Sequence, residues 1–350
     1  MAAAAVLLLC LRPAGAGAIP VFARQYGLSC QACHTTVPQL NKFGQAFRDS
    51  GYRWPAATPA RGTVPIAMKI NLAYTSAADP TGLPKAVVDE IEFLSFGPVG
   101  KHLAYRVEQY WVDGGRPGRT RDAFLEYKSD PLSSWHGSGA PVLDVQLGQF
   151  TLPLPNDPET LRPTENHYAI FDQTVGDNSF NLFDDRIGLN AGFGNRLAEV
   201  RVLAMKDRDT MLSARVGPAA FSLWTYQYRG ERILGSVTDD FVRRGVALTS
   251  TAGKAQTSFL LQTGTDRSPF GLGDAASSSG GYLQEEWAFS DRWIGTARYD
   301  GLNGPDGFMR STTLSLSYRP YNRARWTLED VIQTQPQTTR TLNAAWLFAY

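Results

Sequence analysis

The sequence predicts a mainly β protein, a transmembrane up-and-down β-barrel of about 16 strands preceded by a small α-helical N-terminal unit. Three observations predict this fold class. Apolar and polar residues alternate with period two through most of residues 63–350. The connections between the alternating runs divide into tight turns and long loops. A compact motif of two cysteines and a histidine stands before the first run, followed by a helical pattern.

The chain begins with a predicted signal peptide over residues 1–18. A short apolar run at residues 2–11 is followed by Ala16-Gly17-Ala18, an A-x-A cleavage pattern. The run is shorter than the roughly 20 apolar residues that a spanning helix needs. Cleavage removes Arg12, one of 34 basic residues, and leaves as many basic as acidic side chains, because the chain has 33 of the latter. This neutral, interspersed charge excludes the basic face that a nucleic-acid partner requires.

Residues 19–62 are predicted to form a monohaem cytochrome c unit. Cys30-Gln31-Ala32-Cys33-His34 is the C-x-x-C-H signature of covalent haem attachment. Two thiols three positions apart each form a thioether with one vinyl group of the same porphyrin, and the adjacent imidazole ligates the iron. We therefore predict one covalent haem c held by Cys30 and Cys33, with His34 as the proximal iron ligand. A thioredoxin-like disulfide and a structural zinc site are the alternatives, but the first lacks a βαβ context and the second lacks a further ligand pair nearby.

The residues after the motif predict a helix over 38–50. Leu40, Phe43 and Phe47 recur on one helical face, and Gly51 is placed to end the helix. An apolar stripe of this kind suits either a porphyrin face or an ordinary core. A unit of this size is near the limit below which chains need a covalent or metal staple.

The second axial ligand is not supplied locally, because residues 19–62 contain no Met and no His besides His34. The iron is either five-coordinate or completed by another donor. His167 and His102 are the candidate distal ligands from the rest of the chain, and Lys42 is an unusual local alternative. Axial ligand identity sets the potential and the reactivity of a haem.

Residues 63–350 are predicted to form a porin-like outer-membrane β-barrel. Ile66, Met68, Ile70, Leu72 and Tyr74 share one apolar face of a strand. The same alternation returns at 103–111, 143–147, 198–204, 314–318 and 342–350, where the chain ends in an aromatic residue, Tyr350. A soluble β-sandwich would also alternate, but its core would not accept the charges on the polar faces. Those charges suit a wet lumen, and they include Lys69, Arg106, Glu108, Glu199 and Arg201.

The predicted connections sort by length. Tight turns are expected at 194–195, 217–218, 251–253 and 321–322, and long loops at 76–85, 230–239 and 266–278. The longest connection, Thr151 to Asp184, follows the fifth predicted strand and carries His167 with several prolines and carboxylates. It occupies the place of the constriction loop of sixteen-stranded porins, and we expect it to fold into the lumen.

The run from Ile19 to Tyr52, followed by a barrel, resembles the fused monohaem cytochrome c-porin family of the bacterial outer membrane, of the iron-oxidising type. The resemblance is dense over about 35 residues and architectural elsewhere. It implies that Cys30 and Cys33 are the tethers, that His34 is the proximal ligand, and that a packing frame surrounds them. That frame comprises Pro38, Leu40, Asn41, Phe43, Gly44, Phe47, Gly51 and Tyr52.

The expected function is electron transfer across the outer membrane, with the haem unit in the barrel lumen or on its periplasmic side. The expected partners are membrane lipid, periplasmic electron-carrier cytochromes and an extracellular donor, for which the resemblance suggests Fe(II). Carboxylates of the 151–184 connection suit transient binding of such an ion. An Fe(II) oxidase activity would follow from the same resemblance. The alternatives are a porin with a haem-containing plug or sensor unit and a periplasmic haem enzyme such as a peroxidase.

Overall fold

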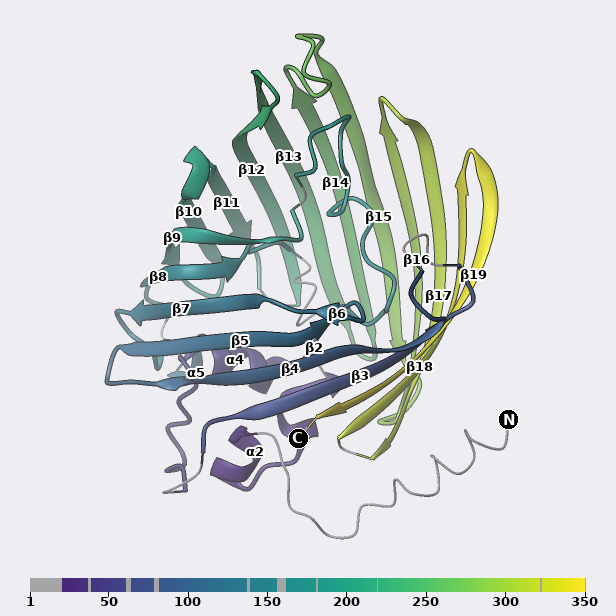
Figure 1. Cartoon of the computed structure of the whole chain (residues 1–350). Coiled ribbons are helices and arrows are strands. Elements are labelled where there is room, and N and C mark those ends of the chain that lie inside the picture. Colours follow the sequence, from purple (N-terminus) through teal and green to yellow (C-terminus); the bar gives the residue numbers. More distant parts are fainter. Residues whose placement is uncertain are drawn as a thin grey trace, which may run out of the picture.

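The computed structural model describes residues 21–36, 39–60, 64–78, 82–136, 139–155, 162–180, 182–218, 220–321 and 323–349. The chain forms a small N-terminal unit beside one end of a large barrel (Figure 1). The predicted signal peptide and Tyr350 lie outside the described residues.

The N-terminal unit consists of short helices and one small hairpin. Its elements are α2 (Val21–Tyr26), α3 (Cys30–Cys33), β1 (His34–Thr36), β2 (Gln39–Leu40) and α4 (Lys42–Asp49). The predicted helix over 38–50 is confirmed for Lys42–Asp49, which form α4, and Gly51 follows it with a positive φ of 63°. Its first part was wrong, because Gln39 and Leu40 form the strand β2, which pairs with β1. Pro38 lies outside the described residues.

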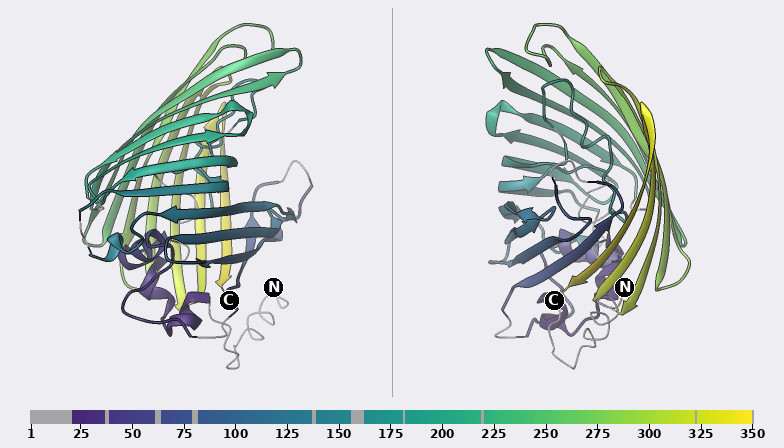
Figure 2. Two further views of the ribbon diagram at one scale, coloured as in Figure 1. Left: turned by 90° about the vertical axis from the view of Figure 1, so that its left-hand side faces the viewer. Right: turned by 45° about the vertical axis from the view of Figure 1, so that its right-hand side comes forward.

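The barrel is closed and antiparallel, with sixteen long strands and the two-residue β6 among the described residues. Its strands are β3 (Ala67–Thr75), β4 (Ala86–Pro98), β5 (Leu103–Asp113), β6 (Arg116–Pro117), β7 (Thr120–Lys128), β8 (Val142–Thr151), β9 (Asp185–Gly194), β10 (Ala198–Met205), β11 (Thr210–Val216), β12 (Phe221–Leu234), β13 (Val237–Ala252), β14 (Ala255–Asp266), β15 (Ala276–Ala288), β16 (Trp293–Gly304), β17 (Gly307–Tyr321), β18 (Ala324–Gln335) and β19 (Gln337–Ala349). Pairing of β19 with β3 closes the barrel, with Phe348 opposite Ile70 (Figure 2).

The alternation predicted from the sequence separates the two faces of the barrel wall. Apolar side chains point outward, as at Trp111 and Leu147, which are 67% and 63% exposed. Charged side chains of the same strands point inward, and Glu108 on β5 is only 2% exposed. This arrangement matches a wall with an apolar exterior and a polar lumen. No helix in the described part of the chain has the length and apolarity of a membrane-spanning helix.

The two ends of the barrel differ. The terminal rim holds the start of β3, the end of β19 and the connections 99–102, 129–141, 195–197, 217–220, 253–254, 289–292 and 322–323. The loop rim holds the connections 76–85, 114–119, 206–209, 235–236, 267–275, 305–306 and 336. Two further short helices lie at the rims, α5 (Ser133–His136) at the terminal rim and η1 (Lys206–Arg208) at the loop rim.

The prediction of a long loop at 230–239 was wrong, because β12 and β13 pair through this region and leave only a two-residue turn. The charged residues in this region suggested a loop, but they continue the hydrogen-bonded pairing of β12 with β13. Arg232 lies opposite Asp239, and its side chain pairs with Asp209 at 2.8 Å. The ion pair of Arg232 with Asp209, which lies in the connection between β10 and β11, makes this charged residue compatible with a strand at the rim.

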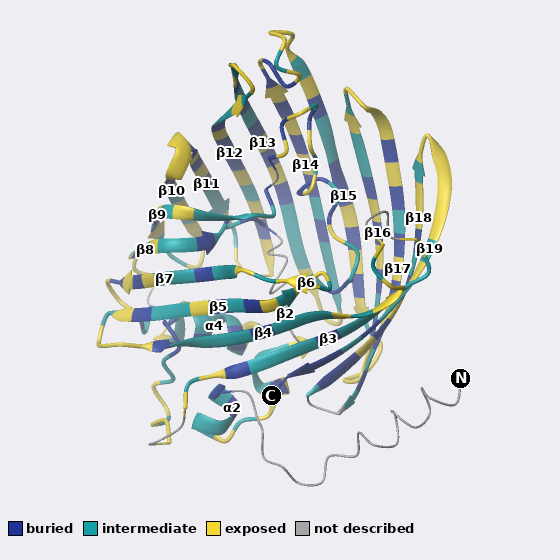
Figure 3. Ribbon diagram, in the orientation of Figure 1, coloured by how far each residue is buried: buried dark blue, intermediate teal, exposed yellow. Residues whose placement is uncertain are grey.

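Residues 152–184, here called the lumen segment, fold into the barrel as predicted. The segment follows β8, the fifth long strand, and its described residues pack against the inner wall (Figure 3). Phe171 and Tyr168 are fully buried, and the Tyr168 ring lies 4.5 Å from that of Tyr282 on β15. Polar contacts also hold the segment, since Glu329 of β18 accepts the backbone N–H groups of Glu165 and Asn166.

Candidate functional site: a cavity between the N-terminal unit and the barrel wall

Asn41 joins the Cys30–His34 motif to the following helix. Its side-chain oxygen accepts the N–H of Gly44 at 2.9 Å and so caps α4. Its amide nitrogen donates to the carbonyls of Gln31 and Ala32 at 3.0 and 3.1 Å. One side chain therefore fixes the start of α4 and two carbonyls inside the motif.

Gly44 allows α4 to approach the motif closely. A Cβ built at this position would lie 2.1 Å from the carbonyl oxygen of Cys33, far inside van der Waals contact. A glycine is needed where two backbone segments come this near. The spacing between Cys33 and α4 therefore depends on the absence of a side chain at residue 44.

Tyr52 connects the end of α4 to the barrel. Its φ of 64° is unusual for a residue with a side chain and costs on the order of 1 kcal/mol or more. Its ring stacks on Phe22 of α2 and on Phe96 of β4, at centroid distances of 5.1 and 5.0 Å, and these two rings lie 5.1 Å from each other. Contacts within this three-ring cluster help to offset the strained backbone, and burial raises the pKa of the Tyr52 phenol.

Hydrogen bonds to backbone carbonyls hold the unit at the terminal rim. Arg53 donates to the carbonyl of Leu103 at 2.6 Å, and Trp135 of α5 donates to the carbonyl of Arg53 at 2.8 Å. On another side, Arg319 of β17 donates to the carbonyl of Thr35 at 2.7 Å. The unit is therefore attached to strands that are distant in sequence.

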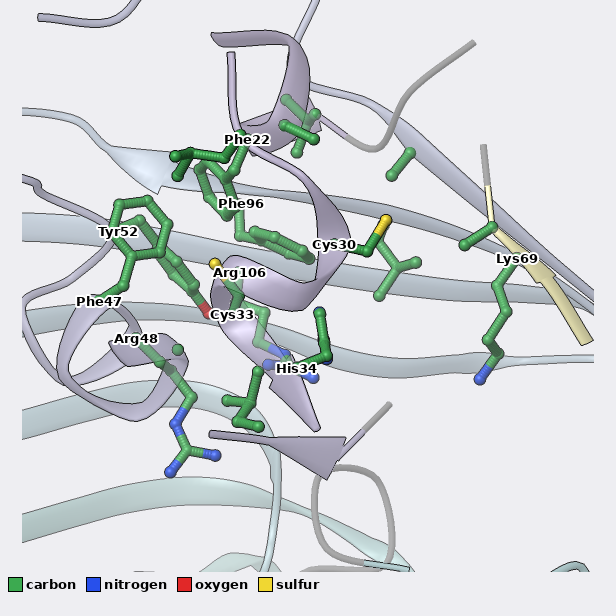
Figure 4. A pocket seen from close by; sticks show the side chains of 18 of the residues that line it. Phe22, Cys30, Cys33, His34, Phe47, Arg48, Tyr52, Lys69, Phe96 and Arg106 are labelled. Carbon is green, nitrogen blue, oxygen red and sulfur yellow. The ribbon is translucent and has the colours of Figure 1, made fainter. Parts of the chain in front are cut away.

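A cavity lies between the unit and the inner wall of β3, β4 and β5 (Figure 4). Its empty volume is about 1200 Å³ with its open mouth included. Cys30, Cys33 and His34 all line it. The unit adds Phe22, Leu28, Leu40, Phe47 and Tyr52, and the barrel adds Ala67, Leu94, Phe96 and Ala349.

Charged barrel residues line the same cavity as two ion-pair systems. Lys69 pairs with Glu92 and, at 3.3 Å, with Glu90. Arg106 pairs with Glu108 and with Asp122, both at 2.6 Å. Each of these side chains is less than a fifth exposed. Arg48 of α4 adds a third positive side chain to the lining.

The chemistry of this lining fits a covalently tethered haem. Two free thiols and an imidazole meet at a mostly apolar cavity that is open on one side, which suits a large flat ring with a polar edge. Burial raises the pKa of both thiols, that of Cys33 to about 11 with a smaller contribution from Cys30. Redox-active C-x-x-C pairs have the opposite, lowered thiol pKa. The described residues contain no group of three or more His, Cys, Asp or Glu that would hold a metal ion directly.

The three candidates for a distal ligand do not line the cavity. His102 lies in the turn after β4, where its Nδ1 is 2.9 Å from the carbonyl oxygen of Lys128. His167 lies in the lumen segment, stacked on Phe183 at 4.6 Å with its Nδ1 3.1 Å from Asp172. Lys42 is exposed at the start of α4. Their role as iron ligands stays a prediction without geometric support.

The sequence reasoning missed the barrel's share of the cavity. On the inward face of β4, Glu90 and Glu92 are followed by the apolar Leu94 and Phe96. This change from acidic to apolar on one face was the available signal. It indicates that the inward face at the end of β4, at Leu94 and Phe96, packs against another part of the protein and does not face the aqueous lumen.

Comparison with solved structures identifies the barrel as porin-like. An anion-selective porin from Comamonas acidovorans superposes with a TM-score of 0.63 at 11% identity, covering 81% of this chain and 98% of the porin. OmpT of Vibrio cholerae gives a TM-score of 0.57 at 12% identity, with 84% and 99% covered. Salmonella typhi OmpF gives 0.56 at 8% identity, with 81% and 96% covered.

These likenesses concern the fold, because the sequences are so different. No protein-family model and no curated protein matches the chain. The barrel therefore has the sixteen-stranded architecture of outer-membrane porins. The chemistry of the N-terminal unit has to be argued from its own residues.

Proposed function

We propose that this protein carries one covalent c-type haem and moves electrons across the bacterial outer membrane. The observation that carries the proposal is the cavity in which Cys30, Cys33 and His34 meet an apolar barrel wall. Bound haem supplies one-electron oxidation and reduction. The cysteines tether it, the imidazole ligates the iron, and Phe22, Phe47 and Phe96 exclude water from its faces.

The position of the cavity favours an electron-transfer role over a soluble enzyme. A soluble periplasmic enzyme would not expose outward apolar residues such as Trp111, Leu147 and Leu328 around a closed wall. In barrels of this kind the longer loops face outward from the cell. The long connections 76–85, 152–184 and 267–275 all leave the loop rim, so we place the terminal rim and the N-terminal unit on the periplasmic side. The apolar band about 25 Å tall otherwise insulates an extracellular donor from periplasmic carriers.

The extracellular donor in this proposal is a soluble metal ion. Fe(II) is the donor that the family resemblance suggests, and carboxylates would bind it transiently. Two described carboxylates of the lumen segment already have partners, since Glu165 pairs with Arg325 at 2.8 Å and Asp172 contacts His167. Asp157 and Glu159 lie outside the described residues.

A porin with a haem-containing plug or sensor is the second candidate, favoured by the porin-like barrel. Liposomes with trapped, oxidised and lysine-succinylated cytochrome c and external Fe(II) separate the two, because the trapped protein cannot leave. With wild-type protein we expect rapid reduction of the trapped protein. The His34→Ala variant removes the proposed iron ligand and leaves the barrel strands unchanged, so reduction should stop. Undiminished reduction by this variant would indicate iron permeation and support the porin.

A further inference from the structure

The terminal rim carries many more basic than acidic side chains. Residues 21–60 carry four basic side chains, Arg24, Lys42, Arg48 and Arg53, against the single acidic Asp49. The connections of the terminal rim add Lys101, Arg196, Lys254, Arg292 and Arg323 against Asp130 and Asp291. This end of the molecule is strongly basic, although the whole chain has a formal charge of only +1.

The exposed cations of the terminal rim lack ion-pair partners in the described part of the chain. Lys42, Lys101, Arg196, Lys254 and Arg292 are all exposed, and none of them forms a salt bridge with another described residue. Unpaired cations on one surface add to a positive potential that attracts an acidic partner.

The loop rim provides the comparison within the same molecule. Its described connections carry Lys85, Arg116, Arg119, Lys206, Arg208 and Arg267, against Asp207, Asp209, Asp274 and Asp306. Three of these six cations form ion pairs with described residues. Arg119 contacts Asp184 at 3.1 Å, Arg208 contacts Glu231 at 3.7 Å, and Arg267 contacts Asp240 at 3.2 Å. The basic surplus is therefore specific to the rim that holds the candidate haem cavity.

The basic turns lie beside the N-terminal unit. Lys101 follows Gly100, whose carbonyl accepts a hydrogen bond from Arg53 of the unit. On another side, Arg319 connects the unit to the turn that carries Arg292, since its backbone N–H donates to the Arg292 carbonyl at 2.9 Å. Cations therefore lie on two sides of the unit, and Lys42 is exposed at the start of α4.

We propose that this basic surface, formed by Lys42 and the terminal-rim cations, docks an acidic soluble electron-carrier protein. The identity of the partner as an electron carrier rests on the proposed function. A soluble protein is favoured over lipid headgroups because α4 lies within the ring of strand ends, where Gly51 approaches Ala104 of the inner wall. Complementary charge steers association and makes the rate and affinity sensitive to salt.

Binding to full-length protein in zwitterionic nanodiscs tests this proposal. The probe is a basic soluble cytochrome c, used native and after succinylation of its lysines, so that the fold is retained and the charge reversed. We expect the succinylated probe to bind and to lose about tenfold in affinity as salt rises from about 20 to 200 mM. The native probe should not bind measurably.

Charge reversal locates the surface. The triple variant Lys101→Glu, Lys254→Glu, Arg292→Glu should weaken binding of the succinylated probe by about tenfold or more. The matched control Lys85→Glu, Lys206→Glu, Arg267→Glu makes the same charge change at the loop rim and should leave affinity unchanged. Equal binding of both probes, or equal effects of the two triple variants, would overturn the proposal.

The same samples separate failure of this inference from failure of the proposed function. Haem content is measured by the pyridine haemochrome assay and does not depend on binding. Salt-sensitive binding without haem would preserve the docking surface and refute the proposed function. Haem without binding in zwitterionic nanodiscs would refute the docking surface and favour lipid headgroups as the anionic partner.

Discussion

Two parts of the chain fill the barrel in different ways. The lumen segment packs against the inner wall with close aromatic contacts, as where Phe180 meets Tyr228 and Phe241 at 4.6 Å. The N-terminal unit instead meets the wall around an open cavity and is attached through hydrogen bonds to carbonyls and aromatic contacts at its edges. The lumen segment forms a closely packed core with the wall, whereas the N-terminal unit is organised around two cysteines and a histidine. The difference indicates a structural role for one and a binding role for the other.

The largest expected effect is on the lumen segment. Phe171→Ala removes a fully buried ring and should lower the free energy of unfolding by about 3–5 kcal/mol, because it creates a cavity in a close-packed cluster. Heat-modifiable gel mobility and urea unfolding measure this loss. Haem content should be unchanged. Leu272→Ala, at a side chain 80% exposed, is the control and should behave as wild type.

Gly44→Ala should act on the N-terminal unit alone. The new methyl group would collide with the Cys33 carbonyl, so α4 must move away and the unit should lose about 1–3 kcal/mol of stability. We expect less haem per chain and normal barrel mobility on a gel. Gly100→Ala is the matched control, because its Cβ meets open space. An unaltered haem content in Gly44→Ala would contradict the packing described for the motif.

Two substitutions of Asn41 distinguish its role as the cap of α4 from its hydrogen bonds to the motif. Asn41→Ala removes the cap of α4 and both bonds to the motif, and should cost about 1 kcal/mol or slightly more. Asn41→Asp keeps the cap acceptor and loses the two donors. If the bonds to Gln31 and Ala32 orient the motif, both variants should shift the haem reduction potential. A shift confined to Asn41→Ala would assign the effect to the cap.

The smallest expected effect concerns attachment of the unit to α5. Trp135→Phe keeps an aromatic ring beside Phe43 and removes the hydrogen bond to the Arg53 carbonyl. The unit should lose about 0.5–1.5 kcal/mol, as is usual for one hydrogen bond. Hydrogen exchange of α4 amides should increase while that of the barrel strands stays constant. Faster exchange in the strands would mean that the unit and the barrel unfold together.

The features that could be predicted from the sequence are those set by residues close together in the chain. Alternation identified the outward face of strands such as β3 and β10, and the length of the 151–184 connection identified an insert that the structure places in the lumen. The C-x-x-C-H spacing identified the candidate haem residues, and the structure brings all three to one cavity.

The remaining features depend on contacts between distant residues. The local sequence around Arg53 or Trp135 does not indicate that the two residues are in contact, because 82 positions separate them. The contribution of β4 to the cavity depends on barrel closure, and the strand at 230–239 depends on pairing across β12 and β13. Local periodicity does not report such long-range pairing.

Intact-protein mass spectrometry tests the central claim most directly. Wild-type protein made in cells with c-type haem maturation should be heavier than its mature polypeptide by the mass of one haem. The double variant Cys30→Ala, Cys33→Ala should have its polypeptide mass alone. A wild-type chain at the bare polypeptide mass, or a haem that survives in the double variant, would contradict the assignment of Cys30 and Cys33 as the tethers.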